Sequence, residues 1–224
     1  MIFSRTSGDD DFHDWLDGEF AWRRRELLHH ETLVRSAKPP NEAMTIRSAI
    51  PMLYAHWEGF VKAAGTAYLD FVLSRGKNFE QLKANFLALG MKRHLMEAES
   101  SLKAKVFTQA CSLVLTQRGR RAYFITKDAV DTRMNLNFEI FDNICVSLGI
   151  VVRPEYEGAK NTIIDPVLGF RNTVAHGKEL LVSRGRYLEL HAGLFDIMNL
   201  FRNDLDNAVT MKSYIETTVA TVTT

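Results

Sequence analysis

The residues of this sequence best suited to chemistry are an arginine and a histidine that lie five positions apart. Arg171 is followed directly by Asn172, and His176 closes the same run, RNTVAH. A histidine with a pKa of about 6.5 can accept a proton from a ribose 2′-hydroxyl or return one to a leaving 5′-oxygen. An arginine can bind the charged phosphoryl oxygens, and Asn172 could orient the imidazole or the phosphate. These residue types suit one reaction in particular, a metal-independent cleavage of RNA that spares DNA and leaves a 2′,3′-cyclic phosphate.

The helix that must carry this run limits how its side chains can cooperate. Asp165-Pro166 predicts the start of the helix, and Gly177 predicts its end. At roughly 100° per residue, Arg171 and His176 point about 140° apart. One copy cannot easily direct both at a single phosphate, whereas two copies around a twofold axis could share one cleft. On spacing alone the pair also fits a structural role, because a histidine near a helix C-terminus often only partners the helix dipole.

Apolar residues elsewhere recur about every 3.6 positions, the period of a helix. Two long helices joined by a short turn at Pro39-Pro40 should form an antiparallel pair, and Pro51 should kink the second. Only YFITKDAV, residues 123–130, has strand character, and it is too isolated to form a sheet. The expected helices cover residues 9–37, 41–74, 79–117 in one or two pieces interrupted near Gly90, 136–148, a stretch from Asp165, and 187–215. The predicted fold class is all-α, an antiparallel helical bundle with additional flanking helices in a single domain over residues 1–215, with a disordered tail at 216–224.

Composition and cysteine content indicate a cytoplasmic protein. The 224 residues, 46% of them hydrophobic, suffice for a buried core, and the net charge of +1 requires any RNA contact to be local. Early acidic residues argue against a signal peptide, and no run is apolar enough to span a membrane. Cys111 and Cys145 lie in apolar runs without metal-site spacing, so both should be buried free thiols. We expect neither a metal nor another cofactor.

Three segments resemble the HEPN superfamily, the higher eukaryote and prokaryote nucleotide-binding domains. RNTVAHG, residues 171–177, resembles its signature, while residues 50–72 and 135–150 resemble the long helix and the middle block of a prokaryotic subfamily, the RiboL-PSP type. The resemblance implies an all-helical homodimer with a composite active site that cleaves RNA as a toxin or effector in a defence or toxin–antitoxin system. An antitoxin or another defence-system protein is then an expected partner. HEPN toxins silenced by a nucleotidyltransferase typically have a tyrosine where this chain has Lys178, which argues against that mode of control.

The second long helix holds a candidate supporting residue. The resemblance suggests that a polar side chain on this helix approaches the motif. Glu58 falls off the apolar stripe and is a better candidate than His56. Trp57 lies on the stripe and should belong to the core.

A basic loop offers candidate RNA-binding residues. Arg118, Arg120 and Arg121 surround Gly119, which marks a loop, and Tyr123 follows closely. Loop cations can hold phosphates, and a tyrosine can stack on a base. The alternative interpretation is a solvated loop without RNA contact.

Two functions from different classes fit these observations. The first is an endoribonuclease in which His176 is the general base or acid, Arg171 the phosphate clamp and Asn172 the orienting residue. The second is a non-catalytic HEPN module that binds a nucleotide, an RNA or a partner protein. The sequence has no P-loop, zinc-peptidase or serine-hydrolase motif, so those chemistries lack support.

Overall fold

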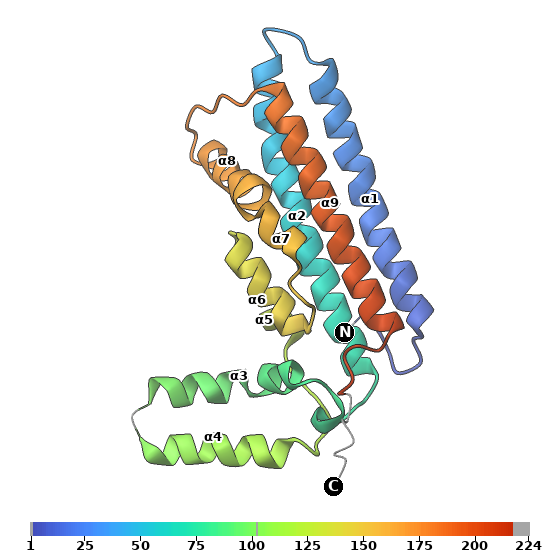
Figure 1. Cartoon of the computed structure of the whole chain (residues 1–224), viewed down its shortest axis with the longest axis vertical. Coiled ribbons are helices and arrows are strands. Elements are labelled where there is room, and N and C mark those ends of the chain that lie inside the picture. Colours follow the sequence, from blue (N-terminus) through green and yellow to red (C-terminus); the bar gives the residue numbers. More distant parts are fainter. Residues whose placement is uncertain (1, 102, 217–224) are drawn as a thin grey trace.

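Three long helices form the body of the molecule. The computed structural model describes residues 2–101 and 103–216. α1 (Asp9–Ser36) turns back into α2 (Glu42–Ser74), and α9 (Arg184–Thr210) packs against both. Figure 1 shows α2 and α9 running in one direction and α1 in the other. The all-α antiparallel bundle is thereby confirmed, and none of the described helices is long and apolar enough to cross a membrane.

Burial explains why α2 is the central helix. Its side chains are buried on nearly every face in its second half, and Trp57 and Phe60 have no exposed surface. α1 and α9 instead bury mainly one stripe each, which includes Leu16 and Phe201. A helix that is apolar all round belongs in the middle of a bundle. Pro51 lies inside α2 without ending it.

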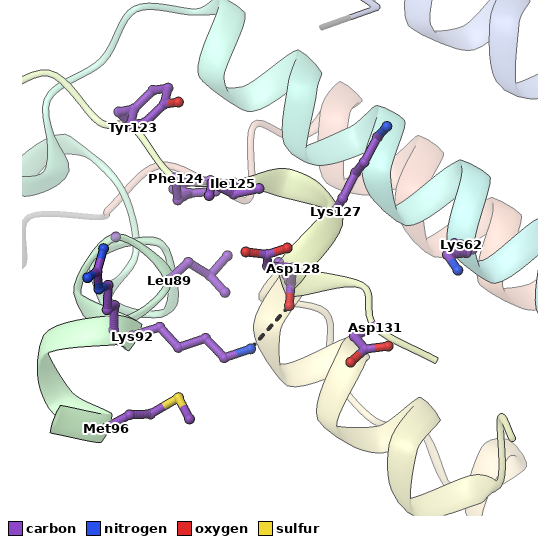
Figure 2. Close-up of a pocket in the computed structure, with 13 residues that line it drawn as sticks. Lys62, Leu89, Lys92, Met96, Tyr123, Phe124, Ile125, Lys127, Asp128 and Asp131 are labelled. Carbon is purple, nitrogen blue, oxygen red and sulfur yellow. Dashed lines mark hydrogen bonds between the residues drawn. The ribbon is translucent and has the colours of Figure 1, made fainter. Parts of the chain in front are cut away.

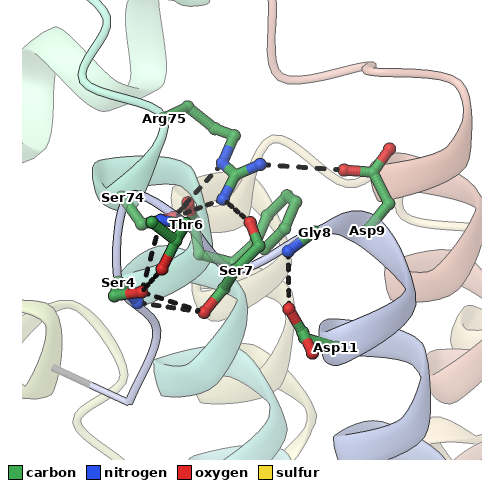
Figure 3. A network of polar contacts seen from close by, with 9 residues as sticks. Ser4, Thr6, Ser7, Gly8, Asp9, Asp11, Ser74 and Arg75 are labelled. Carbon is green, nitrogen blue, oxygen red and sulfur yellow. Dashed lines mark hydrogen bonds and ion pairs between the residues drawn. The ribbon is translucent and has the colours of Figure 1, made fainter.

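A polar network ties the end of α2 to the start of α1. Figure 3 shows the guanidinium of Arg75 donating to the carbonyl of Ser7 and, at 3.1 Å, to the hydroxyl of Ser74. Asp9 lies 3.9 Å from the same guanidinium as an ion-pair partner. These contacts fix the pairing of the two helices at the end where the chain leaves the bundle.

A second layer covers one side of α2 and α9 (Figure 1). It consists of α6 (Phe138–Leu148), α7 (Pro154–Ala159), the π-helical turn η2 (Lys160–Ile164) and α8 (Asp165–Ala175).

α8 begins at Asp165, but Asp165 does not cap it. α7 and η2 run directly into α8, so helical turns precede that residue. The Oδ1 atom of Asp165 instead accepts the amide of Phe138, the first residue of α6, at 2.9 Å, and Asn137 is the N-cap of that helix. Gly177 ends α8 with a left-handed φ of 69°, as expected.

α3 (Ala84–Ser100) and α4 (Ala104–Gln117) form a hairpin that projects from the bundle, as Figure 1 shows. The expected interruption near Gly90 is wrong, because α3 continues through it and the break follows Ser100. A Cβ atom on Gly90 would lie only 2.4 Å from the ring of Phe79. This glycine therefore marks a close packing contact rather than the end of a helix.

The strand character of residues 123–130 produces no strand, in line with the expectation that this segment is too isolated to build a sheet. Among the described residues the only β pairings are isolated bridges, one of which joins Asn78 to Arg121. Thr126–Ala129 forms the short helix α5. In the extended stretch before it, Phe124 is buried and Tyr123 is exposed, so the alternation reflects a linker lying on the bundle. An isolated segment has no neighbour with which to build a sheet.

The structure agrees only in part with the expected thiols and chain end. Cys145 is buried as expected, but Cys111 is exposed, because α4 packs chiefly on α3 and leaves its other side open. The last helix ends at Thr210, and the amide of Glu216 donates to the backbone of Gln81 at 3.0 Å. The rest of the expected tail, residues 217–224, lies outside the described residues.

Candidate active site

α8 places Arg171, half-buried, against the loop that leads into α6. Its Nη1 donates to the side-chain oxygen of Asn172 at 2.7 Å, and its Nη2 donates to the carbonyl of Met134 at 3.0 Å. The guanidinium carbon lies 4.5 Å from the ring centroid of Tyr54, a cation–π distance. These contacts hold the planar group in one orientation. Its Nε–H and one N–H of Nη2 have no acceptor among the described residues.

The loop that receives Arg171 has a strained backbone. Arg133 and Met134 both have a left-handed backbone conformation, with φ angles of 50° and 55°. Residues other than glycine rarely adopt this conformation. The buried Thr132 anchors the loop by donating its hydroxyl to Glu58 at 2.5 Å. Strain of this kind persists only where surrounding contacts enforce it, and such places are often functional sites.

Tyr54 joins Arg171 to this loop and is a site residue that was not predicted from the sequence. Its hydroxyl accepts the amide of Leu136 at 2.6 Å, while its ring contacts the guanidinium. Burial above all, together with the negative charge of Glu58, raises the pKa of Tyr54 to about 12, so the phenol stays neutral. The available signal was its position four residues before Glu58, which places both side chains on one face of α2.

Glu58 reaches the site indirectly, through Thr132 and Tyr54. His56 does not reach it, because its Nε2 lies 3.0 Å from the carboxylate of Glu26 on α1. Trp57 is fully buried, as expected for the core. Of the three neighbours on α2, Glu58 alone faces the loop that holds Arg171.

His176 lies exposed at the end of α8. Its imidazole has no hydrogen-bond partner among the described residues, and no described contact joins it to Arg171. The turn that follows is tied to α2, because Nη1 of Arg47 donates to the carbonyl of Lys178 at 2.5 Å. A single chain therefore holds its arginine firmly and leaves its histidine open to solvent.

A family model for MAE_28990-like HEPN matches residues 12–214, nearly the whole chain. The chain belongs to this HEPN family. No curated protein and no solved structure matches it significantly. The HEPN resemblance of the RNTVAHG motif is thereby confirmed, whereas the RiboL-PSP subtype is not. Membership indicates an RNase or a nucleotide-binding module.

Within this HEPN domain, Asn172 serves the arginine rather than the imidazole. Its side-chain oxygen accepts from Arg171, and its backbone carbonyl accepts the amide of His176 at 3.0 Å. Among the described residues, no group of three His, Cys, Asp or Glu side chains is placed to hold a metal ion. The chemically competent groups of the motif are thus the guanidinium and the imidazole.

The basic loop of the HEPN domain lies apart from α8. Arg118, Arg120 and Arg121 are all exposed after the end of α4. Two amides of η1 (Phe79–Gln81) donate to carbonyls of this loop at 2.9 and 3.1 Å, which pins it beyond the C-terminal end of α2. α8 packs alongside α2, so the structure does not bring the loop to Arg171. Its contact with RNA stays a prediction.

Proposed function

We propose that this HEPN domain is a metal-independent endoribonuclease that acts in the cytoplasm as a toxin or effector of a prokaryotic defence or toxin–antitoxin system. One observation carries the proposal. Arg171 is held in a fixed orientation with N–H groups left over, while His176 is open to solvent at the end of the same helix. A fixed donor suits a charge that develops on a phosphate, and an accessible imidazole suits proton transfer.

In the proposed reaction, the ribose 2′-oxygen forms a bond to the adjacent phosphorus as the bond from phosphorus to the 5′-oxygen breaks. His176 takes the 2′-hydroxyl proton or supplies the proton that the leaving 5′-oxygen gains, and water accepts or supplies the other proton. Arg171 donates to the non-bridging oxygens, and Asn172 keeps the guanidinium in place. The products are a 2′,3′-cyclic phosphate and a 5′-hydroxyl.

A homodimer completes the proposed site. Arg171 and His176 make no contact within the described chain, so a second copy must supply the other half. Packing of two α8 ends around a twofold axis would bring the arginine of one copy to the histidine of the other. Each cleft would then contain one arginine that binds the phosphate and one histidine that transfers protons.

The test is cleavage of a single-stranded RNA oligonucleotide in EDTA by wild type, Arg171→Ala and His176→Ala, with product ends read by mass spectrometry. We expect wild type to cleave and to leave cyclic phosphate ends. Each variant should be slower by at least about 100-fold. DNA and 2′-O-methyl RNA of the same sequence should remain intact, because neither has a free 2′-hydroxyl.

Matched controls come from exposed residues of α1. Arg24→Ala and His29→Ala remove the same side-chain types away from α8 and should cleave as wild type does. Absence of cleavage by a folded, dimeric wild type would contradict the proposal, as would equal cleavage by His176→Ala.

The alternative is a non-catalytic HEPN module that binds a nucleotide, an RNA or a partner protein. The hydrogen bonds of Arg171 to Asn172 and Met134 favour it, since they also stabilise the fold without any substrate. Binding of RNA without cleavage, unchanged in His176→Ala, would support this second function.

A further inference from the structure

A groove of about 820 Å³ lies between α2, α3 and segment 123–131 (Figure 2). Its lining includes Lys62 from α2, Arg93 from α3 and Lys127 from α5, none of which has a carboxylate partner among the described residues. Lys92 also lines the groove, but its Nζ donates to the carbonyl of Asp128 at 3.1 Å and helps to hold the wall together. The groove thus presents three exposed cations that no internal ion pair uses.

Positive charge is concentrated in the segment of the chain that supplies most of the groove lining. Residues 83–127 contain nine lysines and arginines and two glutamates, a net charge of +7. The other residues contain nineteen basic and twenty-five acidic side chains, a net charge of −6. The overall charge of +1 therefore conceals a strongly basic segment, of which Lys92, Arg93 and Lys127 line the groove beside Asp128 and Asp131. A surplus of cations attracts a polyanion.

Aromatic and apolar side chains lie among the cations. Tyr123 is 73% exposed and Ile125 is 59% exposed, although large apolar side chains tend to be buried. Tyr123 also lines an adjoining hollow with Arg121, so the groove continues to the basic loop. An exposed ring between cations is what a single strand needs, because its bases stack while its phosphates pair with charge.

A short stretch of chain links the groove to the candidate active site. Lys62 follows Glu58 by one helical turn on α2. Asp131 lines the groove and begins the loop whose Met134 carbonyl accepts from Arg171. The residues that line the groove and those that hold Arg171 are therefore joined by one short loop.

We propose that Lys62, Arg93, Lys127 and Tyr123 form a basic groove that binds the single-stranded RNA flanking the cleaved bond. The inference rests on the proposed function, and it adds the path of the substrate and its single-stranded character. Phosphates meet the three cations, and one base stacks on Tyr123.

The test measures binding rather than cleavage. A fluorescein-labelled single-stranded RNA oligonucleotide is titrated with His176→Ala protein, and anisotropy gives Kd at several salt concentrations. In the same background, the variant Lys62→Gln/Arg93→Gln/Lys127→Gln loses three phosphate contacts. The slope of log K, the association constant, against log salt should therefore become less negative by about 2. That change corresponds to binding on the order of 100-fold weaker at 0.1 M salt. Tyr123→Ala should weaken binding roughly five- to 100-fold and leave the slope unchanged.

The matched control removes three exposed cations from α1 and the turn after it, Arg24→Gln/Arg25→Gln/Lys38→Gln. It has the same net charge as the groove variant, and its Kd should stay within about twofold of the parent. Equal Kd values for the parent and the groove variant would overturn the proposal, as would equal losses in both triple variants or no RNA binding at all.

The two proposals fail in different ways. Cleavage with an unaffected groove variant would refute the groove and leave the ribonuclease intact. Loss of RNA binding in the groove variant, together with a wild type that never cleaves, would support the groove and refute the ribonuclease.

Discussion

Arg171 and His176 differ in how the fold treats them. The guanidinium is held by Asn172, Met134 and the ring of Tyr54, whereas the imidazole has no described partner. A group that stabilises developing charge gains from being oriented before the reaction, because no reorganisation is then needed. A group that transfers protons must instead meet the substrate. The asymmetry agrees with the roles proposed for the two residues.

Tyr54→Phe tests the support beneath the arginine. The substitution keeps the ring under Arg171 but removes the oxygen that accepts the amide of the fully buried Leu136. An unpaired buried amide should lower the free energy of unfolding by about 1–3 kcal/mol, measured by urea denaturation. Tyr123→Phe removes the same hydroxyl from an exposed ring and should change it by less than about 0.5 kcal/mol. Equal effects of the two variants would contradict the support proposed for Tyr54.

At the scale of elements, the run from α7 through η2 to α8 determines where the motif lies. η2 is a π-helical turn whose Ile163 and Ile164 are buried. Gly193 on α9 permits the close approach, because a Cβ there would lie 2.6 Å from Cδ1 of Ile163. The position of α8 therefore depends on a contact with a helix distant in sequence.

Gly193→Ala should destabilise the protein, although alanine normally favours a helix over glycine. Overpacking against Ile163 should cost about 1–3 kcal/mol, more than the helix propensity that alanine contributes. Gly18→Ala on α1 is the matched control. Because its added Cβ meets nothing beyond its chain neighbours and the backbone of its own helix, the variant should raise the free energy of unfolding by up to about 1 kcal/mol. Thermal or urea unfolding would show the opposite signs, and equal stabilisation by both would refute the contact.

At the scale of the whole molecule, the proposed site requires two copies. A mixture of Arg171→Ala and His176→Ala protein should regain cleavage after subunits exchange. With random exchange about half of the dimers are mixed, and each has one cleft with an intact arginine and an intact histidine. Activity should then rise well above that of either variant alone. No recovery, with exchange verified by labelled subunits, would place both residues of the site in one chain.

Stability should fall in mild acid, because two histidines are buried between the long helices. Burial above all lowers the pKa of His56 and of His191 below 6.5 in the folded protein. The unfolded chain therefore binds more protons below that pH, and folding free energy is lost as the pH falls through about 6.5 toward the folded values. Tm should drop between about pH 7.5 and pH 5.5, and less so in His56→Gln/His191→Gln. An unchanged Tm would contradict the destabilising role given to the two buried histidines.

Apolar periodicity alone predicted the helical class and the long helices, because a helix that buries one face must repeat its apolar residues about every 3.6 positions. The RNTVAHG run likewise indicated the HEPN superfamily. These features are local, and a single helix contains all the information they need.

Contacts between distant segments determined the rest. Gly90 resembles a break until the ring of Phe79 is placed on it, and Asp165 resembles its own helix cap until Phe138 donates to it. Tyr54 becomes part of the site because the fold packs α2 beneath α8. The basic groove forms because α2, α3 and α5 meet around it. Periodicity shows which face of a helix is buried, but it contains no information about which distant residue will cover that face.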